Sequence, residues 1–309
     1  MSEHAPLALF VSYPFCKRKC AFCPRPVYSA PAPTRRRYLD ALIKELEASS
    51  KAAAGQEVCA VRFGGGQPCQ ASVEELSNVL GCVRSNFSLS PHVEITLKAQ
   101  PEPAENSAAG WLDAGFNRID CPIVTTDPFA RKLLGLPQLR GALGRFGFGG
   151  CENTGAELCF GLPGQTAGDL KEALFEILSL GAKHITLRPF SLSRDTPLGE
   201  FYGKHPDRFL NCPKRNIPSK EQAEELQNGA KAVLQSAKMQ EYLPLRFAFP
   251  GWECRFERAR AFGGDILGFG CFARSRFRGM RFGNTEFLDA YIANSPDFDK
   301  ITAKLSIFG

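Results

Sequence analysis

The chain has 309 residues, of which 44% are hydrophobic and 23% are charged, so it can bury a sizeable core and wholesale disorder is excluded. It carries 38 Lys and Arg against 32 Asp and Glu, a mildly basic balance that permits an anionic partner without requiring one. The longest stretch without a charged residue, from His4 to Cys16, is shorter than the roughly 20 apolar residues of a membrane span. The first residues lack the basic region of a secretory signal, so we expect a cytoplasmic protein without a membrane span.

Short apolar runs alternate with helical patterns along the first two thirds of the chain. Six runs have the length and the β-branched or aromatic content of buried strands: Leu7–Tyr13, Val58–Phe63, Val93–Ala99, Arg118–Val124, Ala156–Phe160 and His184–Phe190. Four helical patterns lie between them: Arg36–Ala48, Val73–Val83, Ala104–Ala114 and Asp169–Leu180. The alternation predicts βαβ units and a parallel sheet, either open or curved into a partial barrel.

Local signals mark several helix ends. Thr34 is the predicted N-cap of the first helix, and Ser72 with Glu75 forms the pattern of a capping box at the second. Gly115 and Gly181 follow two helical patterns at the position of a C-cap glycine. The stretch Thr126–Gly149 is interrupted by a proline and several glycines, so any helix there should be short or broken.

The composition changes near Ser193, where prolines become frequent, and we expect a first domain over residues 1–195 and a smaller region over 196–309. A helical pattern, Lys220–Lys238, precedes a Gly- and Arg-rich segment. Seven arginines of that segment alternate with Phe: Arg255, Arg258, Arg260, Arg274, Arg276, Arg278 and Arg281. These arginines suit a small anionic ligand such as a tetrapyrrole. The alternatives are a solvated basic surface without a ligand and an RNA-binding surface, of which nucleic acid is the less favoured partner.

Three of the twelve cysteines lie together, directly after the first predicted strand. Cys16, Cys20 and Cys23 form a C-x3-C-x2-C arrangement with basic residues 17–19 between the first two, which we expect to lower the thiol pKa values. A zinc site normally takes four protein ligands, and no fourth Cys or His lies nearby in the sequence. An iron–sulfur cube, in contrast, can leave one iron without a protein ligand.

The cysteine spacing resembles the cluster loop of radical S-adenosylmethionine (SAM) enzymes. Further segments, in the same order, resemble the oxygen-independent coproporphyrinogen III oxidase and heme-chaperone branch of that family: VRFGGGQP (61–68), VEITLKAQP (93–101), AGFNRI (114–119), GLPGQT (161–166) and ECRFERARAFGGDILGFGCFARSR (253–276). The resemblance implies an α/β fold, a partial (β/α)6 radical-SAM-type barrel with a small α+β C-terminal extension. The C-terminal domain usual in that branch is expected to be missing or cut short.

The resemblance also implies the cofactors and their ligands. A [4Fe-4S] cluster would be held by Cys16, Cys20 and Cys23. SAM would be bound by Gly64, Gly65 and Gly66, whose backbone can approach a ligand closely, together with the side chains at the positions of Lys98 and Glu157. No catalytic residue is predicted.

Several positions depart from the family pattern where it contacts SAM. Lys98 replaces a Glu, Val124 replaces a Gln, Leu136 replaces an Arg, and Glu157 replaces an Asp. Each hydrogen bond to a charged group is worth roughly 1.5–3 kcal/mol, so losing two or three would weaken SAM binding by about a thousandfold or more. Departures elsewhere are Phe10, Ser12, Phe256, Glu257 and Arg274.

Two functions from different classes follow. The first is a radical-SAM-like [4Fe-4S] protein that reductively cleaves SAM to a 5′-deoxyadenosyl radical, for oxidation or methyl transfer on an unidentified substrate, with a reductant such as flavodoxin or ferredoxin. The alternative is an iron–sulfur or heme-binding relative that has lost SAM cleavage, in which Cys69, or less favourably Cys121 or Cys159, caps the open iron. Whether the protein is an enzyme is left open between them. A zinc-structured nucleic-acid module would explain only the cysteines and the basic segment.

Overall fold

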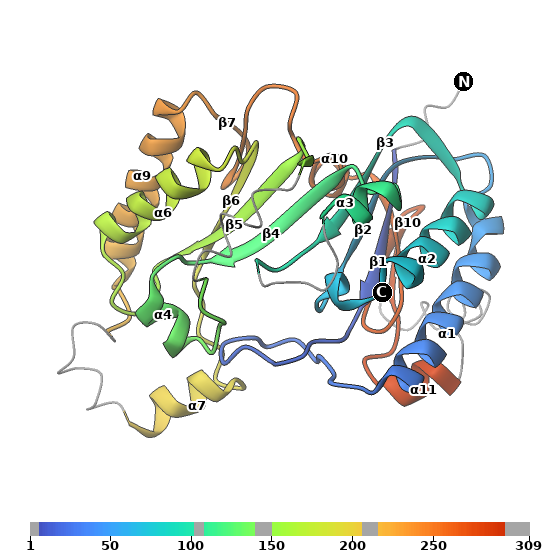
Figure 1. The fold of residues 1–309 in the computed structure, drawn as a ribbon, viewed down its shortest axis with the longest axis horizontal. Helices are drawn as coiled ribbons and strands as arrows, with labels where there is room; N and C mark the ends of the chain where they lie inside the picture. Colours follow the sequence, from blue (N-terminus) through green and yellow to red (C-terminus); the bar gives the residue numbers. More distant parts are fainter. Residues whose placement is uncertain (1–5, 102–107, 140–149, 206–215, 294–309) are drawn as a thin grey trace.

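A computed structural model describes residues 6–101, 108–139, 150–205 and 216–293 of the chain. Its centre is one sheet of eleven strands (Figure 1). Six consecutive parallel strands form the middle of the sheet: β1 (Leu7–Tyr13), β2 (Glu57–Gly65), β3 (Ser88–Lys98), β4 (Arg118–Val124), β5 (Thr154–Phe160) and β6 (His184–Pro189). All six strands predicted from the apolar runs are confirmed, and the sheet is parallel there as expected.

Strands from the C-terminal region extend the sheet at both edges. β9 (Asp265–Phe269) pairs in parallel with β1 and is followed by an antiparallel pair, β10 (Arg274–Phe277) and β11 (Met280–Gly283). At the other edge, β8 (Arg246–Ala248) pairs antiparallel with β6, and β7 (Gln240–Leu243) pairs with β8. The chain between β8 and β9, which includes α10 (Arg255–Ala261), therefore runs from one edge of the parallel sheet to the other.

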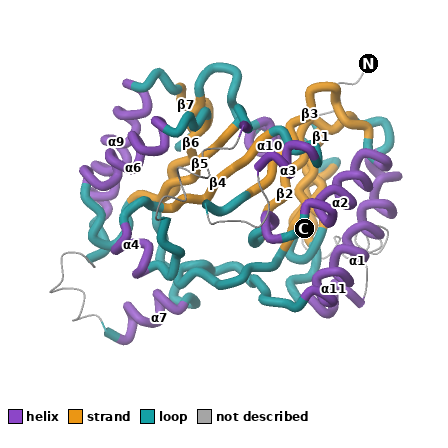
Figure 2. The backbone as a smooth tube through the Cα atoms, in the orientation of Figure 1, coloured by secondary structure: helices purple, strands orange, loops and turns teal. Residues whose placement is uncertain are grey.

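Helices cover one face of the sheet in two groups (Figure 2). α1 (Ala32–Ser50) packs on α2 (Val73–Asn86) over the first strands, and α6 (Ala167–Ser179) packs on α9 (Lys220–Ser236) over β5 and β6. The shorter helices are α3 (Ala108–Asp113), α4 (Pro128–Leu133), α7 (Pro197–Lys204) and α11 (Leu288–Ala293). Alternate residues of the strands fill the apolar core beneath the helices, so the residues between them face the opposite side of the sheet.

The helix-end predictions have mixed outcomes. The capping box of Ser72 and Glu75 is confirmed, and Gly115 and Gly181 both adopt positive φ after their helices. The N-cap prediction for Thr34 is wrong, because α1 begins one turn earlier, after Pro31, with a proline in its first turn. In the stretch 126–149 only the short α4 lies among the described residues, and the positions from 140 to 149 lie outside them.

Candidate functional site

The cysteine loop leaves β1 at its carboxyl end and is bonded to the glycine segment at the end of β2. The Gly66 N–H donates to the Tyr13 carbonyl at 2.7 Å, and the Gln67 N–H donates to the Phe15 carbonyl at 2.8 Å. Arg25 donates from Nη1 to the Gly65 carbonyl at 3.1 Å. A Cβ on Gly66 would lie 2.5 Å from the Phe15 oxygen, so the close approach requires glycine at this position. The predicted metal and cofactor segments therefore lie side by side.

The second half of the cysteine loop extends across the sheet to the segments that follow β4 and β6. The Ala21 N–H donates to the Leu134 carbonyl at 3.0 Å, and the Leu198 N–H donates to the Ala21 carbonyl at 2.9 Å. In Figure 1 the blue segment between β1 and α1 accordingly extends toward α4 and α7. The loop thus spans the carboxyl ends of the strands, where ligands bind in parallel α/β sheets.

The three predicted cluster ligands are half-buried in this loop, and all eleven described cysteines are thiols. Among the described residues, no group of three or more Cys, His, Asp or Glu side chains is arranged closely enough to hold a metal ion. Burial, together with the nearby thiols of Cys20, Cys23 and Cys69, raises the pKa of Cys16 to about 12. Three thiols in one short loop are the donor type that an iron–sulfur cluster takes, although the described side chains are not gathered around one point.

The prediction that residues 17–19 lower the pKa of the loop thiols is wrong for Cys16. These three side chains are exposed to solvent, and the cation that lowers the pKa of Cys16 is Arg25. Burial and the neighbouring thiols outweigh it, so the pKa of Cys16 is raised rather than lowered. The predicted thiolate character therefore does not arise from the protein alone.

Two of the positions that depart from the family pattern are apolar and pack beside the loop. Val124 and Leu136 belong to a small apolar cluster with Phe22, Cys159 and Leu162 at the carboxyl ends of β4 and β5. Val124 has a φ of 69°, which is rare for a β-branched residue and follows an irregularity in the pairing of β4 with β5. This part of the site offers apolar contact where the family pattern has amide and guanidinium groups.

The other two positions are bonded to each other. Lys98, at the end of β3, donates from Nζ to Glu157 of β5 at 3.2 Å. Arg188 of β6 donates to both carboxylate oxygens of Glu157 at 3.1 Å, and an Arg62 nitrogen lies 3.7 Å from the same carboxylate. These cations hold the pKa of Glu157 well below its usual range despite the burial that opposes ionisation. The charge reversal at Lys98 is therefore compensated inside the protein.

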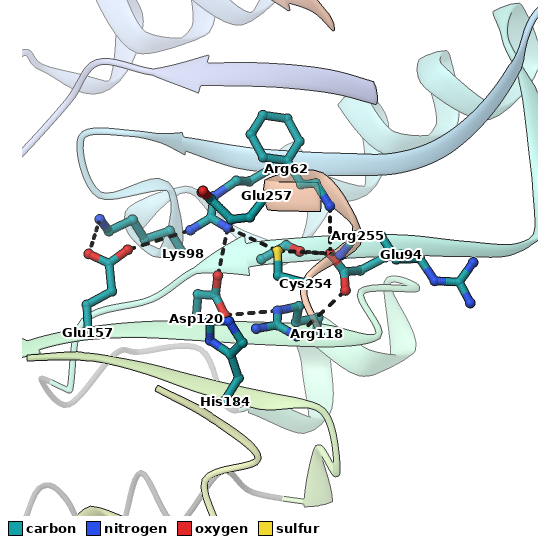
Figure 3. A network of polar contacts seen from close by, with 12 residues as sticks. Arg62, Glu94, Lys98, Arg118, Asp120, Glu157, His184, Cys254, Arg255 and Glu257 are labelled. Atoms are coloured by element: carbon teal, nitrogen blue, oxygen red, sulfur yellow. Dashed lines mark hydrogen bonds and ion pairs between the residues drawn. The ribbon is translucent and has the colours of Figure 1, made fainter. Parts of the chain in front are cut away.

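The ion pairs continue deeper along the same face of the sheet (Figure 3). Arg62 bridges to Asp120 of β4 at 2.7 Å, and Asp120 accepts from Arg118 at 3.0 Å. Arg118 also lies 3.6 Å from Glu94, whose Oε1 accepts the N–H groups of Arg255 and Phe256 at the start of α10. The network therefore joins the parallel strands to the C-terminal region.

Sequence reasoning missed most of this network. Arg62, Glu94, Asp120 and Arg188 were not singled out, although a signal was present. Charged residues lie an even number of positions apart, four in β3 (94 and 98) and two in β4 (118 and 120). Such alternation places them on one face of the sheet. Buried charges at those positions indicate a polar interior rather than an ordinary apolar barrel.

The remaining departures pack with one another. The Phe10 and Phe256 rings have centroids 6.1 Å apart, and the Arg62 guanidinium lies 5.8 Å from the Phe256 centroid. Glu257 accepts from Arg246 and Arg260 at 3.0 and 2.9 Å. Of the seven C-terminal arginines, Arg276 donates to backbone carbonyls, whereas the other six are exposed. Those six do not form a buried anion site.

The fold is that of a radical-SAM-type α/β protein, as comparison with solved structures shows. The coproporphyrinogen III oxidase HemN from Escherichia coli, described as a radical SAM enzyme, superposes with a TM-score of 0.76 over 94% of this chain and 69% of its own, at 22% identity. A radical SAM methyltransferase, TsrM from Kitasatospora setae, gives a TM-score of 0.52 at 12% identity. At these identities the likeness is one of fold.

Sequence comparison narrows the class to one branch. A heme chaperone, HemW from Synechocystis, is 26% identical over 93% of this chain and 70% of its own length. The bovine mitochondrial radical S-adenosyl methionine domain-containing protein 1 is 28% identical over 87% of this chain and 60% of its own. No family model matches. The chain is similar in sequence to radical SAM proteins of the heme-chaperone and coproporphyrinogen oxidase branch, as the sequence motifs predicted.

In the described part of the chain, every helix is too short or too polar to serve as a membrane span.

Proposed function

We propose that the protein is a radical-SAM-like iron–sulfur protein, in which Cys16, Cys20 and Cys23 hold a [4Fe-4S] cluster beside the glycine segment 64–66. When bound, such a cluster supplies the electron for reductive cleavage of SAM to a 5′-deoxyadenosyl radical. The observation that supports this function is the pair of backbone hydrogen bonds that joins the cysteine loop to Gly66 and Gln67. They fix the thiols next to a backbone that a ligand can approach closely.

The chain's own residues have separate roles in this proposal. The thiols would hold the cluster, and the glycine carbonyls would accept hydrogen bonds from the ammonium group of SAM. The apolar cluster around Val124 would offer apolar contact to the rest of SAM and exclude water. Glu157 orients Lys98 and Arg188 at the edge of the site.

A second function is supported by a specific observation, the ion pair between Lys98 and Glu157. Both positions contact SAM in the family pattern, and here each satisfies the other at 3.2 Å. Together with the apolar Val124 and Leu136, this favours a relative that holds an iron–sulfur cluster or heme and no longer cleaves SAM. A tetrapyrrole suits such a site, because its apolar plane and its carboxylates match the apolar cluster and the cations Lys98 and Arg188.

The two functions are separated by one experiment. The protein is reconstituted anaerobically with iron and sulfide, reduced in the presence of SAM, and assayed for 5′-deoxyadenosine beside a Cys20→Ala variant. Product that depends on Cys20 supports SAM cleavage, whereas a full cluster without product supports the second function. Protein that takes up no iron and sulfide in either form contradicts both.

The same proposal includes the partners and the compartment. An active cluster of this kind requires a low-potential reductant, such as flavodoxin or ferredoxin, and a reducing compartment such as the cytoplasm, in which thiols persist.

A further inference from the structure

The buried ion-pair network on the inner face of the sheet carries an excess of positive charge. Four cations are linked through it to three carboxylates: Arg62, Lys98, Arg118 and Arg188 to Glu94, Asp120 and Glu157. His184, which lies beside the network, adds no positive charge, because burial lowers its pKa to about 3. Glu257 also raises the pKa of Arg62 and Arg188, but its carboxylate is itself paired with Arg246 and Arg260. The network therefore keeps one cation in excess, and a partly buried cation without a counter-charge favours an added anion.

The unused donors of the network lie at its outer end. Lys98 has three N–H groups, and among the described residues only Glu157 accepts from one of them. Arg188 uses Nε and Nη2 for Glu157, which leaves Nη1 for another acceptor. The Arg188 side chain is 43% exposed and that of Lys98 is 17% exposed, whereas Arg62 and Arg118 are buried. An incoming anion therefore reaches Lys98 and Arg188 first.

This outer end adjoins the cysteine loop. Arg25, which is bonded to the Gly65 carbonyl, is close enough to lower the pKa of Lys98, as do Arg188 and Arg62, although burial is the largest cause and Glu157 opposes it. Cys159, two residues beyond Glu157 on β5, belongs to the apolar cluster with Val124 and Phe22. The unused N–H groups of Lys98 and Arg188 thus lie near a further cation, Arg25, and near the apolar cluster that contains Val124.

We propose that Lys98 and Arg188 form an oxyanion subsite, which binds a carboxylate or phosphate group of a small molecule whose remaining part lies against the apolar cluster. The subsite rests on the proposed function and adds that the altered pocket selects a ligand with a negatively charged group. Lys98 is the specificity-determining residue, because a lysine in place of the family's glutamate selects against a cationic group and for an anionic one. Glu157 is a positioning residue, since it holds both cationic side chains.

The test measures binding rather than turnover. Isothermal titration calorimetry is performed on the reconstituted protein and on Cys20→Ala with three probes: succinate, inorganic phosphate and SAM. The variant Lys98→Met keeps the length of the side chain and brings the network to three cations and three carboxylates, so it is expected to fold. Lys220→Met is the matched control, because it removes one positive charge from a side chain that is 85% exposed on α9.

We expect at least one probe to bind to wild type and Lys220→Met alike, with affinity that falls as salt is raised, and to bind at least about tenfold more weakly to Lys98→Met. Binding of succinate or phosphate identifies a general oxyanion subsite, and binding of SAM alone identifies the carboxylate of SAM as the oxyanion. Equal binding to both lysine variants, or no binding of any probe to wild type, overturns the proposal. Because binding is expected to persist in Cys20→Ala, a failure of cluster assembly or of SAM cleavage is distinguished from a failure of the subsite.

Discussion

Glu157 is the single carboxylate shared by Lys98, Arg188 and Arg62. Its removal leaves Lys98 and Arg188 without their counter-charge, whereas Arg62 keeps Asp120 at 2.7 Å. We expect Glu157→Gln to lower the free energy of unfolding by about 3–5 kcal/mol, the usual cost of leaving a buried charge without its partner. Urea denaturation followed by circular dichroism measures this. The exposed Glu224→Gln is the control and should change stability by less than about 0.5 kcal/mol. A Glu157→Gln protein as stable as wild type would show that the cations do not depend on this carboxylate.

Glu45 makes stability depend on pH. Burial raises its pKa to about 7 from 4.5, although its carboxylate accepts hydrogen bonds from Tyr291, Asn284 and the Gly270 N–H. The folded state therefore binds a proton more tightly than the unfolded state. This contribution is fully present below pH 4.5 and is lost as the pH rises through about 7, amounting to about 3 kcal/mol at 1.36 kcal/mol per pKa unit.

The variant Glu45→Gln tests this linkage. Urea unfolding at a series of pH values from 5 to 8 should show wild type losing stability as the pH rises, whereas the variant should lose about 2.5 kcal/mol less over this interval. Parallel pH profiles for the two proteins would rule out Glu45 as the group responsible.

Single residues also show where sequence reasoning stops. The three loop cysteines and the glycines were identifiable, because their spacing and their place after a strand are local features. The pairing of Lys98 with Glu157 was not identifiable, since the two residues are 59 positions apart in the sequence and lie on different strands. A sequence gives the sign of each charge, and only the register of the strands decides which charges meet.

Among the secondary-structure elements, the end of β2 and the loop after β1 form the unit on which cluster binding depends. An added methyl group at Gly66 would overlap the carbonyls of Phe15 and Tyr13 and displace the cysteine loop. We expect Gly66→Ala to lose about 1–3 kcal/mol of stability, as overpacking does. Its iron and sulfide content after reconstitution should fall below that of wild type, as measured by iron and sulfide analysis.

Gly81→Ala provides the matched control within α2. Nothing lies within 4 Å of a Cβ at Gly81, and the helix gains about 0.5–1 kcal/mol from the lower backbone entropy of alanine. Its cluster content should equal that of wild type. If Gly66→Ala also assembles a full cluster, the contact between the two segments is not needed to place the thiols.

Element prediction succeeded for β1 to β6 and failed for the strands of the C-terminal region, including the parallel strand β9. β1 to β6 are apolar runs flanked by clear helical patterns, so the period of the sequence distinguishes them. β8, β10 and β11 have three or four residues each and contain arginine, which leaves no apolar pattern to detect. They are strands only because β6 and β9 offer them an edge to pair with.

For the whole molecule, the C-terminal region completes the sheet at both edges, so the parallel strands depend on it. A chain ended after Lys238 would lose β7 to β11 and α10. The outer edges of β1 and β6 would then be unpaired, and Glu94 would lose its hydrogen bonds to α10. We expect this fragment to lack a cooperative urea transition by circular dichroism. A chain ended after Ala293 retains every described element and should unfold as the full chain does. A fragment that unfolds cooperatively would show that residues 1–238 fold independently.

The parallel pairing of β1 with β9 has a consequence for biosynthesis. β1 pairs with β2 on one side, but on its other side Leu7 pairs with Asp265, so β1 acquires its second neighbour only when β9 has been synthesised. Topologies dominated by such distant contacts fold slowly, and unpaired strand edges promote aggregation in the meantime. The nascent chain should therefore associate with chaperones that shield the open edge of β1 until residues 265–269 leave the ribosome.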